Sequence, residues 1–243
     1  MKSEEKKTFY SRYISTHNAH LYKKAAKERI RLHFSAFEKY YGRFLSADKS
    51  KYIFDFGCGD GDLVYWLQEL GFHNTIGADI SSEQIEDAKS LGIKNIFCED
   101  ARKFLADSTV KYDLIFMRDT LGHFDKNEII DIMRLIYKYL NDNSLIIIKT
   151  PNAESPFSGQ LRYGDFTHDV SFTRTSLQQL TEIVGFKDAI AYATPPVVHG
   201  VKSALRAVLW KVIEFCLKFY RLVDSGSGTG IFTQNVIVVA KKY

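Results

Sequence analysis

The sequence predicts a doubly wound α/β fold, in which helices cover both faces of a mostly parallel sheet. Three observations support this prediction. Short apolar runs alternate with helical patterns from Tyr52 onward, and a glycine-rich turn follows the first run. Residues 144–149 are apolar almost throughout, as in strands that are buried on both faces. The chain has 243 residues, 45% of them hydrophobic, which is enough for one large core.

Strands and helices are expected to alternate in the central part of the chain. The expected strands cover residues 53–56, 74–79, 95–98, 112–117 and 144–149. The expected helices cover residues 61–70, 82–91, 101–105 and 126–140. Repeated units of this size indicate parallel strands joined by crossover helices. Residues 151–172 have no clear period and are predicted to form a long loop over the sheet.

The remaining segments add a cap, an edge hairpin and an insertion. Residues 175–184 are predicted to be helical, and 186–193 and 232–240 to form an antiparallel hairpin at the sheet edge. No repeat or low-complexity linker interrupts the chain, so we expect a single domain. Its expected parts are a basic helical cap at residues 1–45, a core at 52–193 and 231–243, and a helical insertion at 194–230.

The insertion contains a predicted amphipathic helix at residues 201–222. On a helical wheel its six charged residues occupy one half and its apolar residues the other. The charges exclude a membrane-spanning helix. Such a helix, about 33 Å long at 1.5 Å per residue, could pack on the sheet, form a homodimer contact or lie peripherally on a membrane. We expect burial within the protein or a dimer.

Composition narrows the possible classes of function. The net charge of +4 is slight for this length and does not indicate a nucleic-acid partner. Cys58, Cys98 and Cys216 lie far apart, without paired or Cys/His ligand spacing, so we expect neither disulfides nor a metal site. The charged N-terminal segment lacks the apolar run of a secretory signal. A cytoplasmic location is expected, with peripheral attachment to the inner membrane face as an option.

The strongest motif is the glycine-rich turn Asp55-Phe56-Gly57-Cys58-Gly59-Asp60-Gly61, between an expected strand and an expected helix. Glycines there let the backbone turn tightly and approach a ligand closely. Asp79 and Asp100 end the next two strands, at the edge where open α/β sheets bind ligands, and Asp79 is placed to accept ribose hydroxyls. The alternative is that these carboxylates are solvated or cap helices. A dinucleotide site fits less well, because the third glycine comes one residue early and Asp55 would repel a pyrophosphate.

These motifs resemble those of the class I S-adenosylmethionine-dependent methyltransferases, from about Tyr52 to Phe186. The matching segments are the glycine-rich turn, Gly77-Ala78-Asp79-Ile80-Ser81, Cys98-Glu99-Asp100-Ala101, Tyr112-Asp113-Leu114-Ile115 followed by Leu121-Gly122-His123-Phe124, and Leu140-Asn141-Asp142-Asn143 leading to Thr150-Pro151-Asn152. One departure is Asn141-Asp142-Asn143, where the family often has Pro-Gly-Gly. The resemblance implies a Rossmann-like seven-stranded sheet that ends in a reversed hairpin.

The resemblance also implies a cofactor, S-adenosylmethionine, which becomes S-adenosylhomocysteine as the product, and no metal. The glycine-rich turn would accommodate the methionine part, Asp79 the ribose, and Asp100 with Ala101 the adenine. The implied cofactor-binding residues are Asp55, Gly57, Cys58, Gly59, Asp79, Ile80, Gln84, Asp100, Ala101 and Arg118.

A second resemblance concerns the acceptor. Residues 162–173 and 13–17 are similar to segments of bacterial methyltransferases of surface-polysaccharide and nucleotide-sugar biosynthesis. That similarity implies O-methylation of a small-molecule or glycan acceptor, namely a saccharide, a sugar phosphate or a nucleotide sugar. N-methylation of a small amine or phospho-amine, or a non-catalytic protein with this fold, are the alternatives.

Methyl transfer from a sulfonium is an in-line displacement, so the protein supplies orientation, and a base where the acceptor is a hydroxyl. His168 is the first candidate for that base, and Asp165 or Asp169 could orient its ring. The alternative role for His168 is to cap the next helix. His123 is the competing candidate. The acceptor-binding candidates are Tyr13, His17, Arg162 and Tyr163, with Tyr163 also a catalytic candidate and Arg118 a possible contact for an anionic acceptor.

Overall fold

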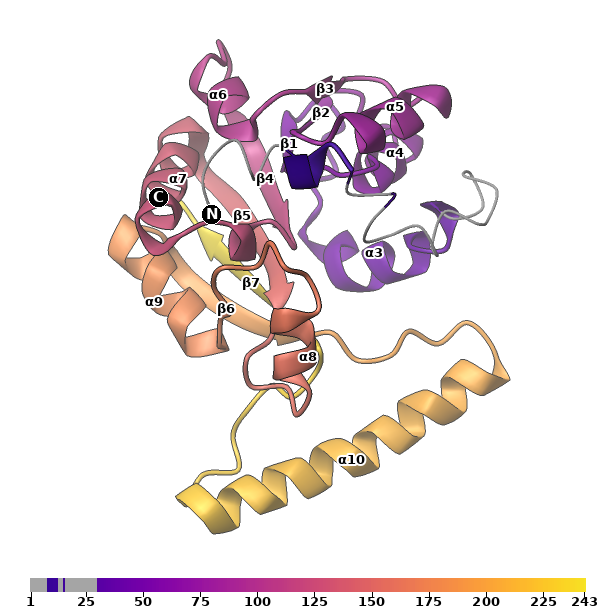
Figure 1. Cartoon of the computed structure of the whole chain (residues 1–243), viewed down its shortest axis with the longest axis vertical. Helices are drawn as coiled ribbons and strands as arrows, with labels where there is room; N and C mark the ends of the chain where they lie inside the picture. The colour runs from indigo at the N-terminus through magenta and orange to yellow at the C-terminus, as the bar shows by residue number, and fades with distance from the viewer. Residues whose placement is uncertain (1–7, 13–14, 16–29) are drawn as a thin grey trace.

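A computed structural model describes residues 8–12, 15 and 30–243 (Figure 1). Its seven strands form one sheet in the order β3-β2-β1-β4-β5-β7-β6. Their bounds are β1 (Ile53–Phe56), β2 (Thr75–Asp79), β3 (Ile96–Cys98), β4 (Tyr112–Arg118), β5 (Leu140–Pro151), β6 (Lys187–Ala193) and β7 (Asn235–Lys241). The first five are parallel, whereas β7 runs antiparallel to both of its neighbours. The predicted α/β fold with an antiparallel C-terminal hairpin is confirmed.

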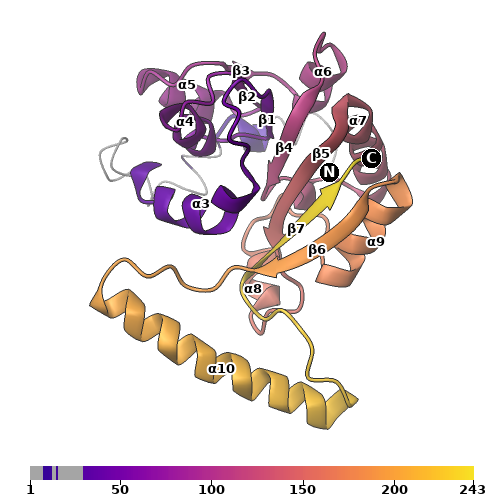
Figure 2. The same ribbon diagram turned by 180° about the vertical axis from the view of Figure 1, so that it is seen from behind.

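Helices cover both faces of this sheet (Figure 2). On one face α6 (Ala101–Ala106), α7 (Lys126–Tyr139) and α9 (Arg174–Val184) close a large core, and on the other α3 (Phe34–Tyr41) and α4 (Asp62–Glu69) close a second. A third cluster joins α4 to α5 (Ser82–Ser90). The short helices η3 (Gly42–Phe44), η4 (Leu121–His123) and α8 (Ser158–Tyr163) lie in connections.

Strand register brings the predicted motifs to one edge. In β1, Asp55 pairs with Gly77 of β2 and Phe116 of β4, so these strands run level with one another. Because they are parallel, their carboxyl ends meet where the glycine-rich turn begins, beside Asp79 and Arg118. The sequence therefore places its candidate ligand-binding residues on neighbouring loops.

Two segments differ from the sequence prediction. The loop expected at residues 151–172 contains α8, which at six residues is too short for a periodic pattern to reveal it. Strand β5 begins at Leu140, directly after α7, rather than at Ser144. Asn143, with a left-handed φ of 62°, turns the chain within this stretch.

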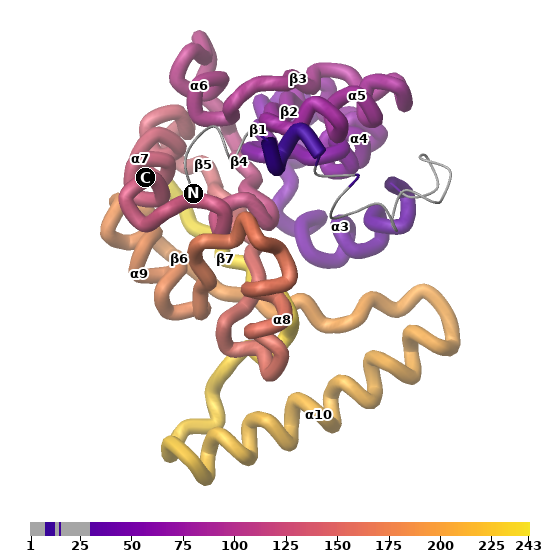
Figure 3. Tube along the Cα trace, in the orientation of Figure 1, coloured from indigo at the N-terminus to yellow at the C-terminus, as the bar shows by residue number. Residues whose placement is uncertain are grey.

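The inserted helix α10 (Val201–Ser225) stands away from the sheet and its covering helices (Figure 3). Its apolar side is exposed, so it is not buried on the sheet, and that part of the sequence expectation is wrong. None of the helices in the described ranges is long and apolar enough to cross a membrane.

Candidate functional site

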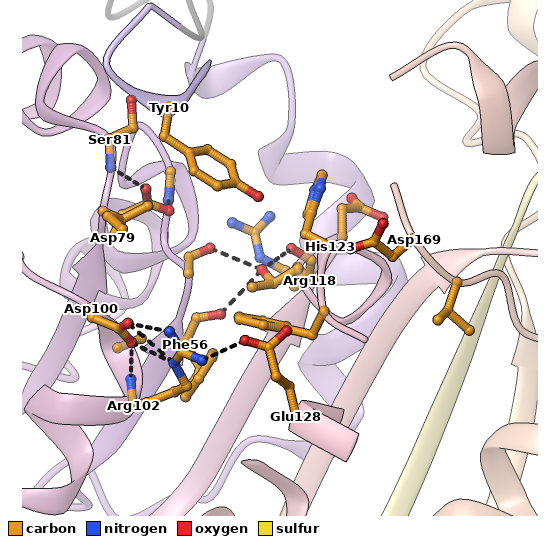
Figure 4. A pocket seen from close by; sticks show the side chains of 18 of the residues that line it. Tyr10, Phe56, Asp79, Ser81, Asp100, Arg102, Arg118, His123, Glu128 and Asp169 are labelled. Carbon is orange, nitrogen blue, oxygen red and sulfur yellow. Dashed lines mark hydrogen bonds and ion pairs between the residues drawn. The ribbon is translucent and has the colours of Figure 1, made fainter. Parts of the chain in front are cut away.

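A cavity of about 720 Å³ opens at the carboxyl ends of the parallel strands. Its walls include eight of the ten predicted cofactor-binding residues, namely Gly57, Gly59, Asp79, Ile80, Gln84, Asp100, Ala101 and Arg118. Figure 4 shows Asp79 and Asp100 on one side of this cavity and His123 with Asp169 on the other. The cavity therefore joins the predicted cofactor motifs to one of the two histidines proposed as a base.

The glycine-rich turn forms part of the wall from bare backbone. Gly57 and Gly59 have φ angles of 75° and 56°, which favour glycine. A Cβ on Gly57 would lie 2.4 Å from the hydroxyl oxygen of Thr120, and one on Gly59 would lie 2.8 Å from Oε1 of Gln84. These positions must stay free of side chains, as a close backbone approach to a ligand requires.

Asp79 is held in a fixed orientation beside this turn. The backbone N–H of Gly59 donates to its Oδ2 at 2.9 Å, and that of Ser81 to its Oδ1 at 2.8 Å. Burial raises the pKa of the Asp79 carboxyl, while the backbone hydrogen bonds oppose that rise. Each carboxylate oxygen has further lone pairs, so the group fits a ribose diol in the cavity.

Asp100 is engaged by a neighbour that sequence reasoning missed. It caps α6 by accepting the backbone N–H of Arg102 at 2.9 Å, and the Arg102 guanidinium donates to its Oδ2 at 2.6 Å. Burial raises the pKa of Asp100, but the Arg102 hydrogen bonds outweigh it and the pKa is lowered. Arg102 also pairs with Glu128 at 3.0 Å, so a planar guanidinium lies in the wall where adenine binding is expected.

Arg118 belongs to a buried ion-pair cluster. Its guanidinium lies 2.6 Å from Asp62 and 3.5 Å from Asp55, and Asp62 is also 2.7 Å from Nδ1 of His33. Only 12% of the Arg118 side chain is exposed. Two carboxylates balance its charge, so Arg118 does not offer that charge to an anionic acceptor, contrary to the sequence expectation.

Two predicted cofactor-binding residues lie behind the cavity wall. Asp55 is fully buried, and burial raises its pKa to about 7 against the attraction of Arg118. The Cys58 side chain is buried against Gly77, where an added Cβ would lie 2.7 Å away. Neither side chain lines the cavity, so both support the glycine-rich turn from behind.

The candidate catalytic residues from two distant segments meet next to the cavity. A ring nitrogen of His123, a carboxylate oxygen of Asp165 and a ring nitrogen of His168 all lie within 4.8 Å of one another. The two imidazole rings stack with their centroids 4.5 Å apart. His123 lines the cavity, whereas His168 lies behind it and is not part of the wall. The carbonyl of Gly122 accepts the backbone N–H groups of Asp169 and Val170, which ties the loop to η4.

Thr167 links this cluster and indicates the protonation of His123. Its hydroxyl donates to Oδ1 of Asp165 at 2.6 Å and lies 2.9 Å from Nδ1 of His123. Because a carboxylate only accepts, the threonine oxygen accepts the Nδ1–H of His123, and Nε2 carries the lone pair. Burial, with the nearby His168, lowers the pKa of His123 to about 4, so the ring is neutral near pH 7.

Of the predicted acceptor residues, Arg162 and Tyr163 are described by the structure, and neither lines the cavity. Tyr163 is 79% exposed outside it. The Arg162 guanidinium instead donates to the backbone carbonyls of His168 and Asp169, and so holds the loop. Tyr13 and His17 lie outside the described residues. Tyr10, which no motif singled out, lines the cavity and packs edge-on against His123.

The cluster of His123, Asp165 and His168 could also hold a divalent ion such as zinc, which imidazole and carboxylate ligands suit. The metal-independence expected from the sequence stays a prediction. We expect exhaustive dialysis against a chelator to leave turnover and melting temperature unchanged. The reason is that Nδ1 of His123 and Oδ1 of Asp165, which could bind a metal, are already hydrogen-bonded to the Thr167 hydroxyl. Activity that is lost on dialysis and restored by zinc would contradict this expectation.

The family model described as "Methyltransferase domain" matches residues 20–189, more than half of the chain. The chain belongs to this methyltransferase family. Over 98 residues the methyltransferase is also 32% identical to the ribosomal protein L11 methyltransferase of Lactobacillus johnsonii. That match covers 39% of this chain and 30% of the relative, so the chain spans about a third of that protein.

Solved structures share the fold of the methyltransferase. An S-adenosylmethionine-dependent methyltransferase from Archaeoglobus fulgidus matches with a TM-score of 0.66 and 22% identity, over 88% of this chain and 94% of that one. The magnesium protoporphyrin IX methyltransferase of Synechocystis PCC 6803, solved with bound S-adenosylmethionine, matches with a TM-score of 0.59 and 16% identity, over 98% and 97%. The predicted class I fold of S-adenosylmethionine-dependent methyltransferases is confirmed.

Proposed function

We propose that the protein transfers the methyl group of S-adenosylmethionine to a hydroxyl of a saccharide, sugar phosphate or nucleotide sugar in surface-glycan biosynthesis. The observation that carries the proposal is His123, a neutral imidazole in the wall of a cavity that contains the cofactor motifs. A hydroxyl needs a base to accept its proton during transfer, and a neutral imidazole provides one.

The residues present fit the cofactor. Gly57 and Gly59 would present bare backbone to its methionine part, Asp79 would accept hydroxyls of its ribose, and Ala101 with the Asp100–Arg102 pair would border its adenine. When bound, the cofactor supplies a methyl group on a sulfonium. The chain orients the acceptor oxygen toward that methyl group, and Nε2 of His123 takes the hydroxyl proton, while Thr167 and Asp165 hold the ring in the required tautomer.

The charge of the wall favours one kind of acceptor. Among the described residues that line the cavity, six are acidic, namely Asp79, Asp100, Asp119, Asp125, Glu128 and Asp169, and three are basic, namely Arg102, Arg118 and Lys126. Arg118 is balanced by buried carboxylates, Arg102 by Asp100 and Glu128, and Asp119 by Lys149, which leaves Asp79, Asp125 and Asp169 against Lys126. Phosphate groups would be repelled by the remaining negative charge, so a neutral saccharide fits better than a phosphorylated one.

The same acidic wall supports a second candidate, N-methylation of a small amine, since carboxylates attract an ammonium group. A transfer assay with methyl-labelled S-adenosylmethionine separates the two. Purified protein is incubated with neutral oligosaccharides, sugar phosphates, nucleotide sugars and small amines, and the labelled atom is located by NMR. We expect label on an oxygen of a sugar. Label on nitrogen would favour the amine. If none of the acceptors leads to formation of S-adenosylhomocysteine, both proposals are contradicted.

A further inference from the structure

Helix α10 presents a broad apolar surface to the outside. Its 25 residues carry an uncharged arc, which we call the apolar arc, about 140° wide at 100° per residue. The arc consists of Val201, Ala204, Leu205, Val208, Leu209, Val212, Phe215, Cys216, Phe219, Leu222 and Val223. Apart from Ala204 all of them are exposed, Phe215 by 71% and Val223 by 72%. A contiguous exposed patch of this kind indicates an interaction surface.

The domain holds this helix by the opposite side. Ser203, its only buried residue, and Arg221 lie on the side of the wheel away from the apolar arc. Arg221 pairs with Glu154 of the domain at 3.2 Å. The Ser203 hydroxyl accepts the backbone N–H of His199, in the segment directly before the helix, at 2.8 Å. Figures 1 and 2 show α10 reached by two extended arms from the same end of the sheet. The polar side therefore faces the domain, and the apolar arc faces away from it.

The charge of α10 indicates which kind of partner fits the apolar arc. The helix has five basic residues, Lys202, Arg206, Lys211, Lys218 and Arg221, and two acidic ones, Glu214 and Asp224, hence a net charge of 5 − 2 = +3. Lysines flank the apolar arc on both edges, with Lys202 on one and Lys211 on the other, where Lys218 is paired with Glu214 at 2.8 Å. An anionic bilayer complements this pattern, because its acyl chains can bury the apolar arc and its negatively charged headgroups can pair with the lysines.

A second copy of the chain fits the same surface less well. If two α10 helices joined their apolar arcs in antiparallel orientation, the Lys211 edge of one would face the Lys211 edge of the other. In parallel orientation the Lys202 edge of one would face the Lys211 edge of the other, and both acidic residues lie off these edges. Antiparallel pairing therefore sets like charges against each other, and parallel pairing brings no acidic residue to either edge.

We propose that α10 lies in the plane of a bilayer that contains anionic lipids, with the apolar arc among the acyl chains and the flanking lysines at the phosphates. The helix thereby attaches the methyltransferase to the membrane surface without spanning it. This inference is independent of the acceptor, because it concerns a surface away from the cavity.

Vesicle flotation of the full-length protein tests the proposal. We expect the protein to float with phosphatidylcholine vesicles that contain phosphatidylglycerol, and much less with phosphatidylcholine alone. Val208→Glu combined with Phe215→Glu should weaken binding at least about tenfold, since two large apolar side chains leave the acyl region. Both residues are exposed, so the domain stays folded. Ile183→Glu, an equally apolar exposed position on α9, is the matched control and should float like the unmodified protein.

Light scattering of the lipid-free protein completes the test. A monomer that floats with anionic vesicles supports the proposal. The proposal is overturned if the protein fails to float, or if Ile183→Glu loses as much vesicle binding as the double variant. It is also overturned if the protein does not bind vesicles and forms a dimer that the double variant dissociates. The last result would assign the apolar arc to a second copy.

Discussion

His123→Asn should lower turnover by about 10²- to 10⁴-fold, the usual contribution of a positioned general base. The asparagine amide can still donate to Thr167, but it has no basic nitrogen to face the cavity. Binding of S-adenosylhomocysteine should be unchanged, because the cofactor motifs lie on the other side of the cavity. Initial rates at saturating cofactor and acceptor, with calorimetry on the same preparations, measure both quantities.

His168→Asn is the matched control, because this ring stacks on His123 but does not line the cavity. It should lose far less turnover. The pH profile adds an independent check. The unprotonated ring is the active form, and the pKa of His123 is lowered to about 4, so activity should persist at pH 5.5 and fall only near pH 4. A large loss in His168→Asn alone would transfer the role to His168, and an activity that is already lost at pH 5.5 would contradict the assignment to His123.

Arg118→Met should lower the free energy of unfolding by about 3–5 kcal/mol, as expected when one partner of a buried ion pair is removed. The substitution keeps the length of the side chain but leaves the carboxyl groups of Asp55 and Asp62 buried without the guanidinium that contacts both. Losses of this size are a large part of the 5–15 kcal/mol that typically stabilises a domain. Urea denaturation followed by circular dichroism measures the change.

Arg134→Met is the control for this variant, since its pair with Asp131, 3.7 Å apart, is exposed and should contribute about 0–1 kcal/mol. Without Arg118, the folded-state pKa of Asp55, which burial already raises, rises further, and the pKa of Asp62, which Arg118 helps to lower, rises as well. The deficit should therefore shrink as pH falls and the carboxyls become protonated, and grow as pH rises. Equal stability of the two variants at pH 7 would mean that the cluster does not support the fold.

The cofactor motifs could be predicted because the fold fixes where they lie. Strand ends in a parallel sheet meet at one edge, so Gly57, Asp79 and Asp100 had to approach one another. Side-chain direction could not be predicted in the same way. Asp55 and Cys58 share the glycine-rich turn, yet their side chains point into the core, a detail that depends on local backbone angles.

The catalytic cluster was only partly predictable. Both histidines stood out by residue type, but which of them lines the cavity depends on how the loop folds over η4. Thr167 was missed, since a threonine between two candidate residues has no distinctive spacing. For α10 the wheel predicted the apolar arc, whereas the side that faces the domain follows from contacts such as Arg221 with Glu154, 67 residues apart.

The measurement that tests the central claim most directly is calorimetric titration of S-adenosylhomocysteine into the unmodified protein and into Asp79→Asn. We expect one molecule bound per chain, and binding about tenfold to a hundredfold weaker in the variant, as for the loss of hydrogen bonds to a charged group. The amide oxygen can still accept one of the two backbone N–H groups that Asp79 binds, from Gly59 or Ser81, whereas the NH2 group cannot accept the other, so part of the loss comes from the turn itself. Absence of binding to the unmodified protein, or undiminished affinity in Asp79→Asn, would contradict the assignment of this cavity to the cofactor.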